Sequence, residues 1–208
     1  MSVDDIFEAV AAERLAIADQ LQTLSAEQLA APSLCEGWSV HHVAAHLTMP
    51  WAVSAPTMAM RVLRARSISR AIDGVTHELA KQSIAEIIDS LRANAHNRKH
   101  PPGLPRAPLT DLLVHGEDVR RPLGLHRAIP MSASRLALQF VTSGRDRGTY
   151  VPTSRLGGLR LVATDQDWAW GEGAQISGRS MSLLLAAMGR RVALPELNGA
   201  ANLLEARL

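Results

Sequence analysis

The stretch LTDLLVHGEDVRRPLG, residues 109–124, places acidic residues around a histidine within an apolar helical pattern. Asp111 and His115 are four residues apart, so on a helix they share one face, with Cβ atoms about 5–6 Å apart. A carboxylate oxygen and an imidazole nitrogen at that separation can converge on one divalent cation. An aspartate hydrogen-bonded to a histidine on a partly buried face explains the same spacing without a metal. The pair by itself therefore leaves both interpretations open.

His46, at the end of the segment VHHVAAHL, is the candidate for a third ligand from another helix. Two histidines and one carboxylate leave a coordination position open, which is typical of catalytic rather than structural zinc sites. Iron, nickel or another divalent cation could bind the same set. A histidine that is hydrogen-bonded and binds no metal is the alternative for His46 alone. A rival scheme pairs His42 with His46 as two ligands on one helix.

Helical periodicity supplies the elements that would position these residues. Apolar residues recur at helical spacing over residues 3–24. Ser25 begins a capping-box pattern that predicts a short helix. Ser39 is the predicted N-cap of the helix that carries His46.

The remainder of the N-terminal half is also predicted to be helical. Pro50 and Pro56 should kink or divide the chain after His46. Further helices are expected up to about residue 72, over 76–96, and over 109–123. Four principal helices in succession predict a four-helix bundle, whose interior is a common place for a metal or cofactor site.

The pattern changes after residue 128, which predicts a second, smaller domain. The expected strands are residues 159–163, 168–170 and 174–177, and the expected helices are 132–145, 179–191 and 199–208. We therefore expect a mainly α protein with an α+β tail. Its domains would be a helical bundle over residues 1–128 and a small α+β domain over 129–208.

Composition and charge exclude two classes of protein. No apolar run approaches the roughly 20 residues that a membrane span needs, and the acidic N-terminus lacks the pattern of a secretory signal, so we expect a cytoplasmic protein. The densest basic run, RVLRARSISR, has no interleaved aromatic residue that could stack on a base. A solvated helix face is the favoured interpretation, and we expect no nucleic-acid partner.

Cys35 is the only cysteine, so an internal disulfide and a cysteine-rich metal site are excluded. It precedes a predicted helix start, where a thiolate can be favoured. A buried, inert cysteine is the interpretation that we favour.

Two separated motifs, PSLCEGWSVHHVAAHL and DLLVHGEDVRRPLG, resemble in order and spacing those of the mycothiol-dependent maleylpyruvate isomerase family. The segment LRLVATDQDWAWGEGAQISGRSMSLLLAAMGR resembles the family's C-terminal domain, so the resemblance extends over nearly the whole chain. It implies a DinB-like four-helix bundle with a zinc site whose ligands, carried over by position, are His46, Asp111 and His115. The isomerase has a glutamate where this chain has Asp111, so a carboxylate one methylene shorter must reach the metal.

The resemblance also places an aspartate at position 118. We expect Asp118 to hold the second nitrogen of a ligating imidazole, because such a ring generally needs a tether. Direct ligation of the metal by Asp118 is the alternative. Arg190, in a terminal Gly-Arg motif, and Arg179 could bind a carboxylate of a cofactor through two parallel hydrogen bonds. Exposed arginines at a helix end are the alternative.

The resemblance implies an enzyme that depends on zinc or another divalent metal and on mycothiol as thiol cofactor or cosubstrate. The metal would activate the thiol for addition to a small-molecule electrophile, with isomerisation or S-transfer as the outcome. Two alternatives are a thiol-independent metal hydrolase and a non-catalytic protein that binds a small ligand. The sequence leaves open whether the protein is a monomer or a homodimer.

Overall fold

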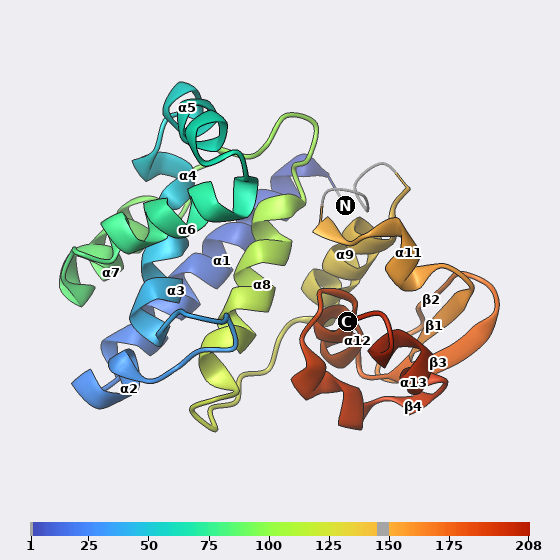
Figure 1. Ribbon diagram of the computed structural model, residues 1–208. Helices are drawn as coiled ribbons and strands as arrows, with labels where there is room; N and C mark the ends of the chain where they lie inside the picture. The colour runs from blue at the N-terminus through green and yellow to red at the C-terminus, as the bar shows by residue number, and fades with distance from the viewer. Residues whose placement is uncertain (1, 145–149) are drawn as a thin grey trace. The chain divides into compact units, whose positions relative to one another are not determined.

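The computed structural model describes residues 2–144 and 150–208 (Figure 1). The chain divides into two compact units, Met1–His126 and Arg127–Leu208. The first is helical and the second combines helices with a small sheet, which confirms the predicted fold class. No helix in the described residues is both long and apolar enough to cross a membrane. The predicted helix over 132–145 ends at a residue outside the described part of the chain.

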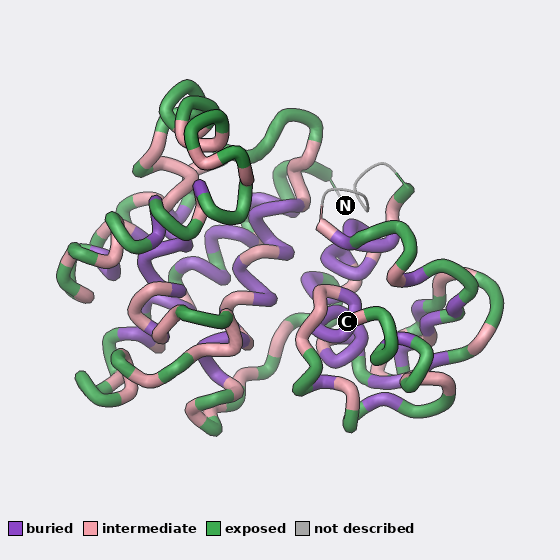
Figure 2. Tube along the Cα trace, viewed as in Figure 1, coloured by how far each residue is buried: buried purple, intermediate pink, exposed green. Residues whose placement is uncertain are grey.

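Eight helices build the described part of the first unit. They are α1 (Val3–Gln22), α2 (Ala26–Ala30), α3 (Val40–His46), α4 (Met49–Ala52), α5 (Ala55–Ala65), α6 (Ile68–Leu79), α7 (Ile84–Ala93) and α8 (Ala107–Arg120). Helix α1 packs against α7 and α8, and α3 packs against α6, α7 and α8. Figure 2 shows the burial concentrated in α1, α3 and α8, whereas α5 has no buried residue. The core of this unit therefore lies among α1, α3, α7 and α8.

Serine N-caps begin most helices of the first unit, and the sequence predicts two of these caps. Ser25 and Ser39 each accept a hydrogen bond from the backbone N–H three residues on, Gln28 and His42 respectively, in capping boxes. The cap at Ser39 fixes the phase of α3, and its last residue, His46, is buried. Local sequence thus places this histidine inside the bundle.

The predicted break between two helices at residues 72–76 is wrong. Helix α6 runs through it, and the chain instead breaks before Ser83, whose capping box with Glu86 starts α7. Gly74 lies inside α6, where glycine costs about 1 kcal/mol relative to alanine. Burial of the adjacent Val75 and Thr76 offsets that cost. Pro50 and Pro56 lie in the first turns of α4 and α5, so the division predicted from them is confirmed.

The second unit consists of short helices and a four-stranded sheet. Its elements are α9 (Met131–Thr142), α11 (Thr153–Leu156), β1 (Leu159–Ala163), β2 (Ala169–Trp170), β3 (Ala174–Gly178), α12 (Ser180–Ala187), η1 (Arg191–Glu196), β4 (Asn198–Gly199) and α13 (Ala201–Glu205). The strand order is β2-β1-β3-β4. The central pair, β1 and β3, is parallel, and the two outer pairs are antiparallel. Helix α12 packs against α9.

The three predicted strands are present, but β4 and η1 were not predicted. Strand β4 has two residues, and Gly199 has a φ of +82°. A glycine with positive φ usually indicates a turn. Here Gly199 pairs with Ile176 of β3 instead. A pattern of alternating residues cannot be recognised over so short a strand.

Candidate metal centre

Three side chains from two helices that are distant in sequence converge inside the first unit. His46 ends α3, and Asp111 and His115 lie one turn apart on α8. One potential ligand atom from each lies within 4.8 Å of the other two. His115 Nε2 is 3.4 Å from Asp111 Oδ1, and His46 Nε2 is 3.9 Å from Asp111 Oδ2.

These distances suit a divalent cation. Ligand atoms at about 2.1 Å from a tetrahedral zinc ion lie about 3.4 Å from one another. The pair on α8 has that spacing, and His46 Nε2 lies 3.9 Å from the other carboxylate oxygen of Asp111. The Asp111 side chain is 37% exposed, whereas that of His46 is 7% exposed, so the cluster opens to solvent at the carboxylate.

Each imidazole is tethered through its other nitrogen. His46 Nδ1 is 3.3 Å from Thr76 Oγ1 on α6, and His115 Nδ1 is 2.9 Å from Asp118 Oδ2. Thr76 and Asp118 are both fully buried. A ligating histidine needs such a partner to fix its tautomer and orientation. Both rings therefore turn Nε2 toward Asp111, and the geometry suits the ligand set predicted from the sequence.

The two histidines have opposite electrostatic environments. Burial, and then the charge of His115, lower the pKa of His46 to about 4, against the opposing effect of Asp111 and Asp118. Burial also lowers the pKa of His115, but the charge of Asp111 and the hydrogen bonds to Asp111, Asp118 and Cys35 raise it well above its usual value. At neutral pH the His46 ring is uncharged, so its free nitrogen can bind a metal ion. The carboxylates around His115 favour a positive charge on that ring.

Cys35 is a member of this neighbourhood that sequence reasoning missed. It is half-buried, and its thiol donates a hydrogen bond of 3.2 Å to Asp118 Oδ2. Its Sγ is also 3.6 Å from His115 Nδ1. Cys35 is thus half-buried rather than buried as expected, and the expectation that it is inert stays a prediction. Residue spacing could not show the contact, because 83 residues separate Cys35 from Asp118.

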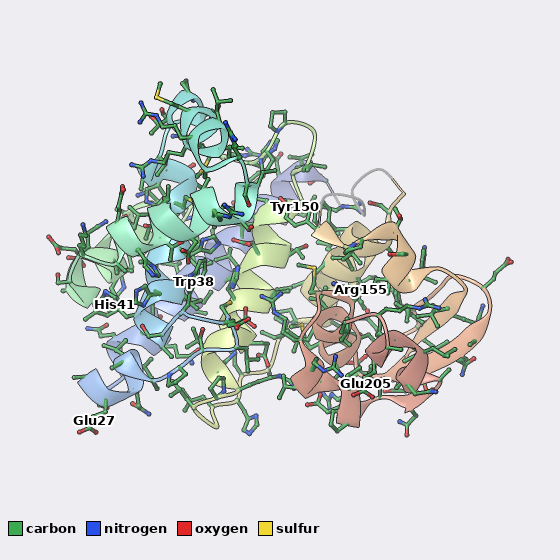
Figure 3. All side chains as sticks on the ribbon, in the orientation of Figure 1. Glu27, Trp38, His41, Tyr150, Arg155 and Glu205 are labelled. Carbon is green, nitrogen blue, oxygen red and sulfur yellow. The ribbon has the colours of Figure 1, made fainter. Side chains whose placement is uncertain are left out.

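Trp38, from the same loop as Cys35, was also missed. Its ring centroid is 5.0 Å from that of His46 and 6.4 Å from that of His115. Its indole N–H donates a hydrogen bond of 2.8 Å to Asp73 Oδ1 on α6. Figure 3 labels Trp38 among the helices of the first unit. The tryptophan thus packs an apolar ring beside both imidazoles.

The rival pair of His42 and His46 is not brought together as a ligand set in the described residues. His42 Nδ1 lies 2.8 Å from Ser39 Oγ, and its ring packs against His77 with centroids 4.8 Å apart. His41 is half-buried, and its Nε2 lies 3.0 Å from the carbonyl oxygen of Ala80 at the end of α6. Both histidines have structural partners outside the cluster.

Gly116 gives the end of α8 room for a buried guanidinium. A Cβ at this position would lie 2.6 Å from Arg120 Nη2. The Arg120 side chain is almost fully buried, and its Nε donates a hydrogen bond of 2.8 Å to Glu117 Oε1. Gly116 thus packs against Arg120, within the helix turn that follows His115.

The two arginines singled out in the second unit lie around α12. Arg179 is exposed at the N-cap, and Arg190 Nη1 donates a hydrogen bond of 2.9 Å to the carbonyl of Met188. Arg155, labelled in Figure 3, donates a hydrogen bond of 3.0 Å to the carbonyl of Ala187. Partial burial, and then the charge of Arg190, lower the pKa of Arg155. A role for Arg179 and Arg190 in cofactor binding stays a prediction.

The fold and the cluster define a helical unit with a group of side chains that could hold a metal ion, followed by a small α+β unit. Residues 10–100 match the family described as mycothiol maleylpyruvate isomerase N-terminal domain. The match ends before Asp111 and His115, so it includes only His46 of the three proposed ligands. No curated protein sequence matches the chain.

Two crystal structures share the fold. One is the mycothiol-dependent maleylpyruvate isomerase, with a TM-score of 0.56 and 16% sequence identity, covering 96% of this chain and 93% of that chain. The other is a histidine-to-alanine mutant of a mycothiol-dependent maleylpyruvate isomerase, with a TM-score of 0.54, 15% identity and the same coverage. Residues 10–100 are therefore similar to the N-terminal domain of the mycothiol maleylpyruvate isomerase family, and the resemblance predicted from the sequence motifs is confirmed.

Proposed function

We propose that this chain is an enzyme of the maleylpyruvate isomerase type that depends on a divalent metal, in first place zinc, and on mycothiol. The observation that carries the proposal is the orientation of the two imidazoles. Both present Nε2 to Asp111 while Thr76 and Asp118 hold the Nδ1 atoms. The family match of residues 10–100 supports mycothiol as the thiol.

His46, Asp111 and His115 would hold the cation. When bound, a divalent cation with an open position lowers the pKa of a thiol or water molecule that enters that position. His46 contributes a neutral nitrogen, because burial keeps it unprotonated at neutral pH. Asp118 keeps His115 oriented, and the exposed edge at Asp111 leaves a path for the thiol cosubstrate.

The reaction would begin with formation of a bond between the thiol sulfur and an electron-poor carbon of a small electrophile. In an isomerisation the addition to an activated double bond is reversible. Rotation about the resulting single bond and loss of the thiol regenerate the thiol and give the isomer. In an S-transfer the carbon–sulfur bond remains in the product. We further propose that Arg179 and Arg190 bind a carboxylate of the cosubstrate.

Metal analysis of the purified protein, combined with Zn²⁺ titration and an assay of maleylpyruvate isomerisation, tests the proposal. We expect His46→Ala, Asp111→Ala and His115→Ala to lose both Zn²⁺ binding and thiol-dependent turnover. His42→Ala is the matched control, because it removes a histidine from the same helix, outside the cluster, and should retain both.

Three outcomes would contradict the proposal. Wild-type protein that binds no divalent metal removes its basis. Hydrolysis of an ester or amide without mycothiol, lost in the same three variants, would indicate a metal hydrolase. Tight binding of a small ligand that His46→Ala leaves unchanged, with no turnover of any electrophile, would indicate a non-catalytic binding protein.

A further inference from the structure

The loop that carries Cys35 is held in a defined shape. Ser33 N–H donates to Trp38 O at 2.9 Å, and Trp38 N–H donates to Cys35 O at 3.0 Å. Ser33 Oγ accepts from Cys35 N–H at 3.1 Å, and Gly37 has a φ of +78°, which suits glycine. The loop is thus closed on itself by its own hydrogen bonds rather than being a loose connection.

This loop is also fastened to the helix that carries two of the proposed ligands. Leu34 N–H donates a hydrogen bond of 3.1 Å to the carbonyl oxygen of Asp118 on α8. The next residue, Cys35, directs its thiol to the side chain of the same aspartate. Backbone and side-chain contacts therefore fix the position of the Cys35 sulfur relative to α8.

The carboxylate of Asp118 depends on its hydrogen-bond donors. The residue is fully buried, and a buried carboxylate is costly unless donors compensate for the lost water. One oxygen, Oδ2, accepts from both His115 Nδ1 at 2.9 Å and the Cys35 thiol at 3.2 Å. Removal of either donor weakens the hold on the carboxylate, and with it the hold on the His115 ring.

We propose that Cys35 is a positioning residue of the metal centre. Its thiol holds Asp118, which in turn holds His115 with Nε2 directed toward Asp111. This inference rests on the proposed function, because it concerns the same metal centre. Cys35 itself is not a ligand, since its sulfur lies at the Nδ1 side of the His115 ring, whereas Nε2 faces Asp111.

A competing assignment makes Cys35 a ligand. Cys35, His115 and Asp118 also form a group whose ligand atoms lie within 4.8 Å of one another. A cation there would need His115 Nδ1, and would therefore displace the 2.9 Å hydrogen bond to Asp118. The open edge at Asp111, the distances from the two Nε2 atoms to the Asp111 carboxylate and the tether at Thr76 favour the other set.

The test compares Cys35→Ala with Cys35→Ser. Zn²⁺ affinity is measured at one pH by competition with a chelating indicator. We expect Cys35→Ala to weaken binding up to about tenfold, the lower end of the effect of removing a partner outside the ligand set. Cys35→Ser should return the affinity to within about threefold of wild type, because a hydroxyl group also donates to a carboxylate. Glu36→Ala, at the adjacent exposed position, is the matched control and should leave the affinity unchanged.

Two spectroscopic measurements separate positioning from ligation and from general damage to the fold. The Co²⁺-substituted protein should show no thiolate-to-cobalt charge-transfer band, and such a band, lost in Cys35→Ser, would overturn the proposal. In metal-free protein, the His115 Nδ1–H resonance should exchange faster with water in Cys35→Ala than in wild type or Cys35→Ser. Circular dichroism and thermal unfolding verify that each variant is folded.

The two proposals fail in distinguishable ways. Wild-type protein that binds neither Zn²⁺ nor Co²⁺ contradicts the proposed function, while the His115 resonance in metal-free protein still reports the effect of Cys35. A Cys35→Ala variant with wild-type Zn²⁺ affinity and an unchanged His115 resonance contradicts the positioning role, and leaves the metal centre intact.

Discussion

The polar clusters of the two units differ in how closely their atoms contact one another. In the second unit, Asp165 Oδ1 accepts hydrogen bonds from the Ser180 N–H at 3.0 Å and the Ser180 hydroxyl at 2.6 Å. Gln166 Nε2 adds a hydrogen bond of 2.7 Å to the same hydroxyl. This cluster is closed, because its donors and acceptors bind one another and start α12.

The cluster of the first unit is open by comparison. His46 and His115 face Asp111 at 3.9 and 3.4 Å, although the Nδ1 sides of both rings are tethered. Short polar contacts stabilise a fold, whereas loosely spaced ligand atoms around one point leave room for a further atom. The spacing within a buried polar cluster thus distinguishes a structural network from a candidate binding site.

The largest expected effect comes from Asp118→Asn. We expect Zn²⁺ affinity to fall about 10–100-fold, because an amide holds the His115 Nδ1–H less firmly than a carboxylate does. The measurement is competition with a chelating indicator. Asp165→Asn, the same substitution in the closed cluster, is the control and should leave the affinity unchanged. Equal losses in both variants would contradict the distinction between the clusters.

Asp165→Asn should instead act on stability. We expect the free energy of unfolding to fall by about 1–3 kcal/mol, because the substitution weakens a half-buried acceptor that binds two donors. Urea unfolding of the metal-free protein provides the measurement. A variant as stable as wild type would show that this network does not stabilise the second unit.

Thr76→Val should have a smaller effect on the metal. The substitution keeps the shape of the side chain and removes the hydroxyl that lies 3.3 Å from His46 Nδ1. We expect Zn²⁺ affinity to fall up to about tenfold, less than in Asp118→Asn, because the lost partner is neutral. If Thr76→Val loses more Zn²⁺ affinity than Asp118→Asn does, the tether at His46 matters more for metal binding than the tether at His115, which contradicts the prediction.

The last prediction concerns the pH dependence of stability in the metal-free protein. His46 has a pKa of about 4 in the folded state and about 6.5 when unfolded, so below pH 6.5 the unfolded state binds the extra proton. The contribution of the neutral His46 to the free energy of unfolding is present above pH 6.5. It is lost as the pH falls toward 4, by up to about 1.4 kcal/mol per pH unit. His115, whose pKa is raised, has the opposite sign and loses its contribution at higher pH.

Urea unfolding at pH 7, 6 and 5 measures this dependence. We expect the free energy of unfolding to fall less steeply with decreasing pH in His46→Gln than in wild type, because glutamine does not titrate. His42→Gln is the comparison: partial burial, and then the charge of His77, also lower the pKa of His42, so this variant should flatten the decline less than His46→Gln does. If the free energy of unfolding depends on pH equally in wild type and His46→Gln, the interpretation of His46 as a neutral, buried residue is contradicted.

The sequence predicted those features that short-range patterns determine. Capping serines marked the starts of α2 and α3, and the Asp111–His115 spacing placed two candidate ligands on one helix face. The break between α6 and α7 was misplaced, because Gly74 indicates an interruption that buried neighbours override. Thr76, Trp38 and Cys35 were missed as members of the site, because their contacts depend on how distant segments pack.

The wide separation of the site residues along the chain also bears on folding kinetics. Eighty residues separate Cys35 from His115, so the cluster forms only after α3, the loop before it and α8 have assembled. Contacts of such high sequence separation form late, since their loop-closure entropy must first be overcome. A cation bound by this cluster would therefore slow unfolding rather than accelerate folding, and the metal-loaded protein would differ from the metal-free protein chiefly in its lifetime.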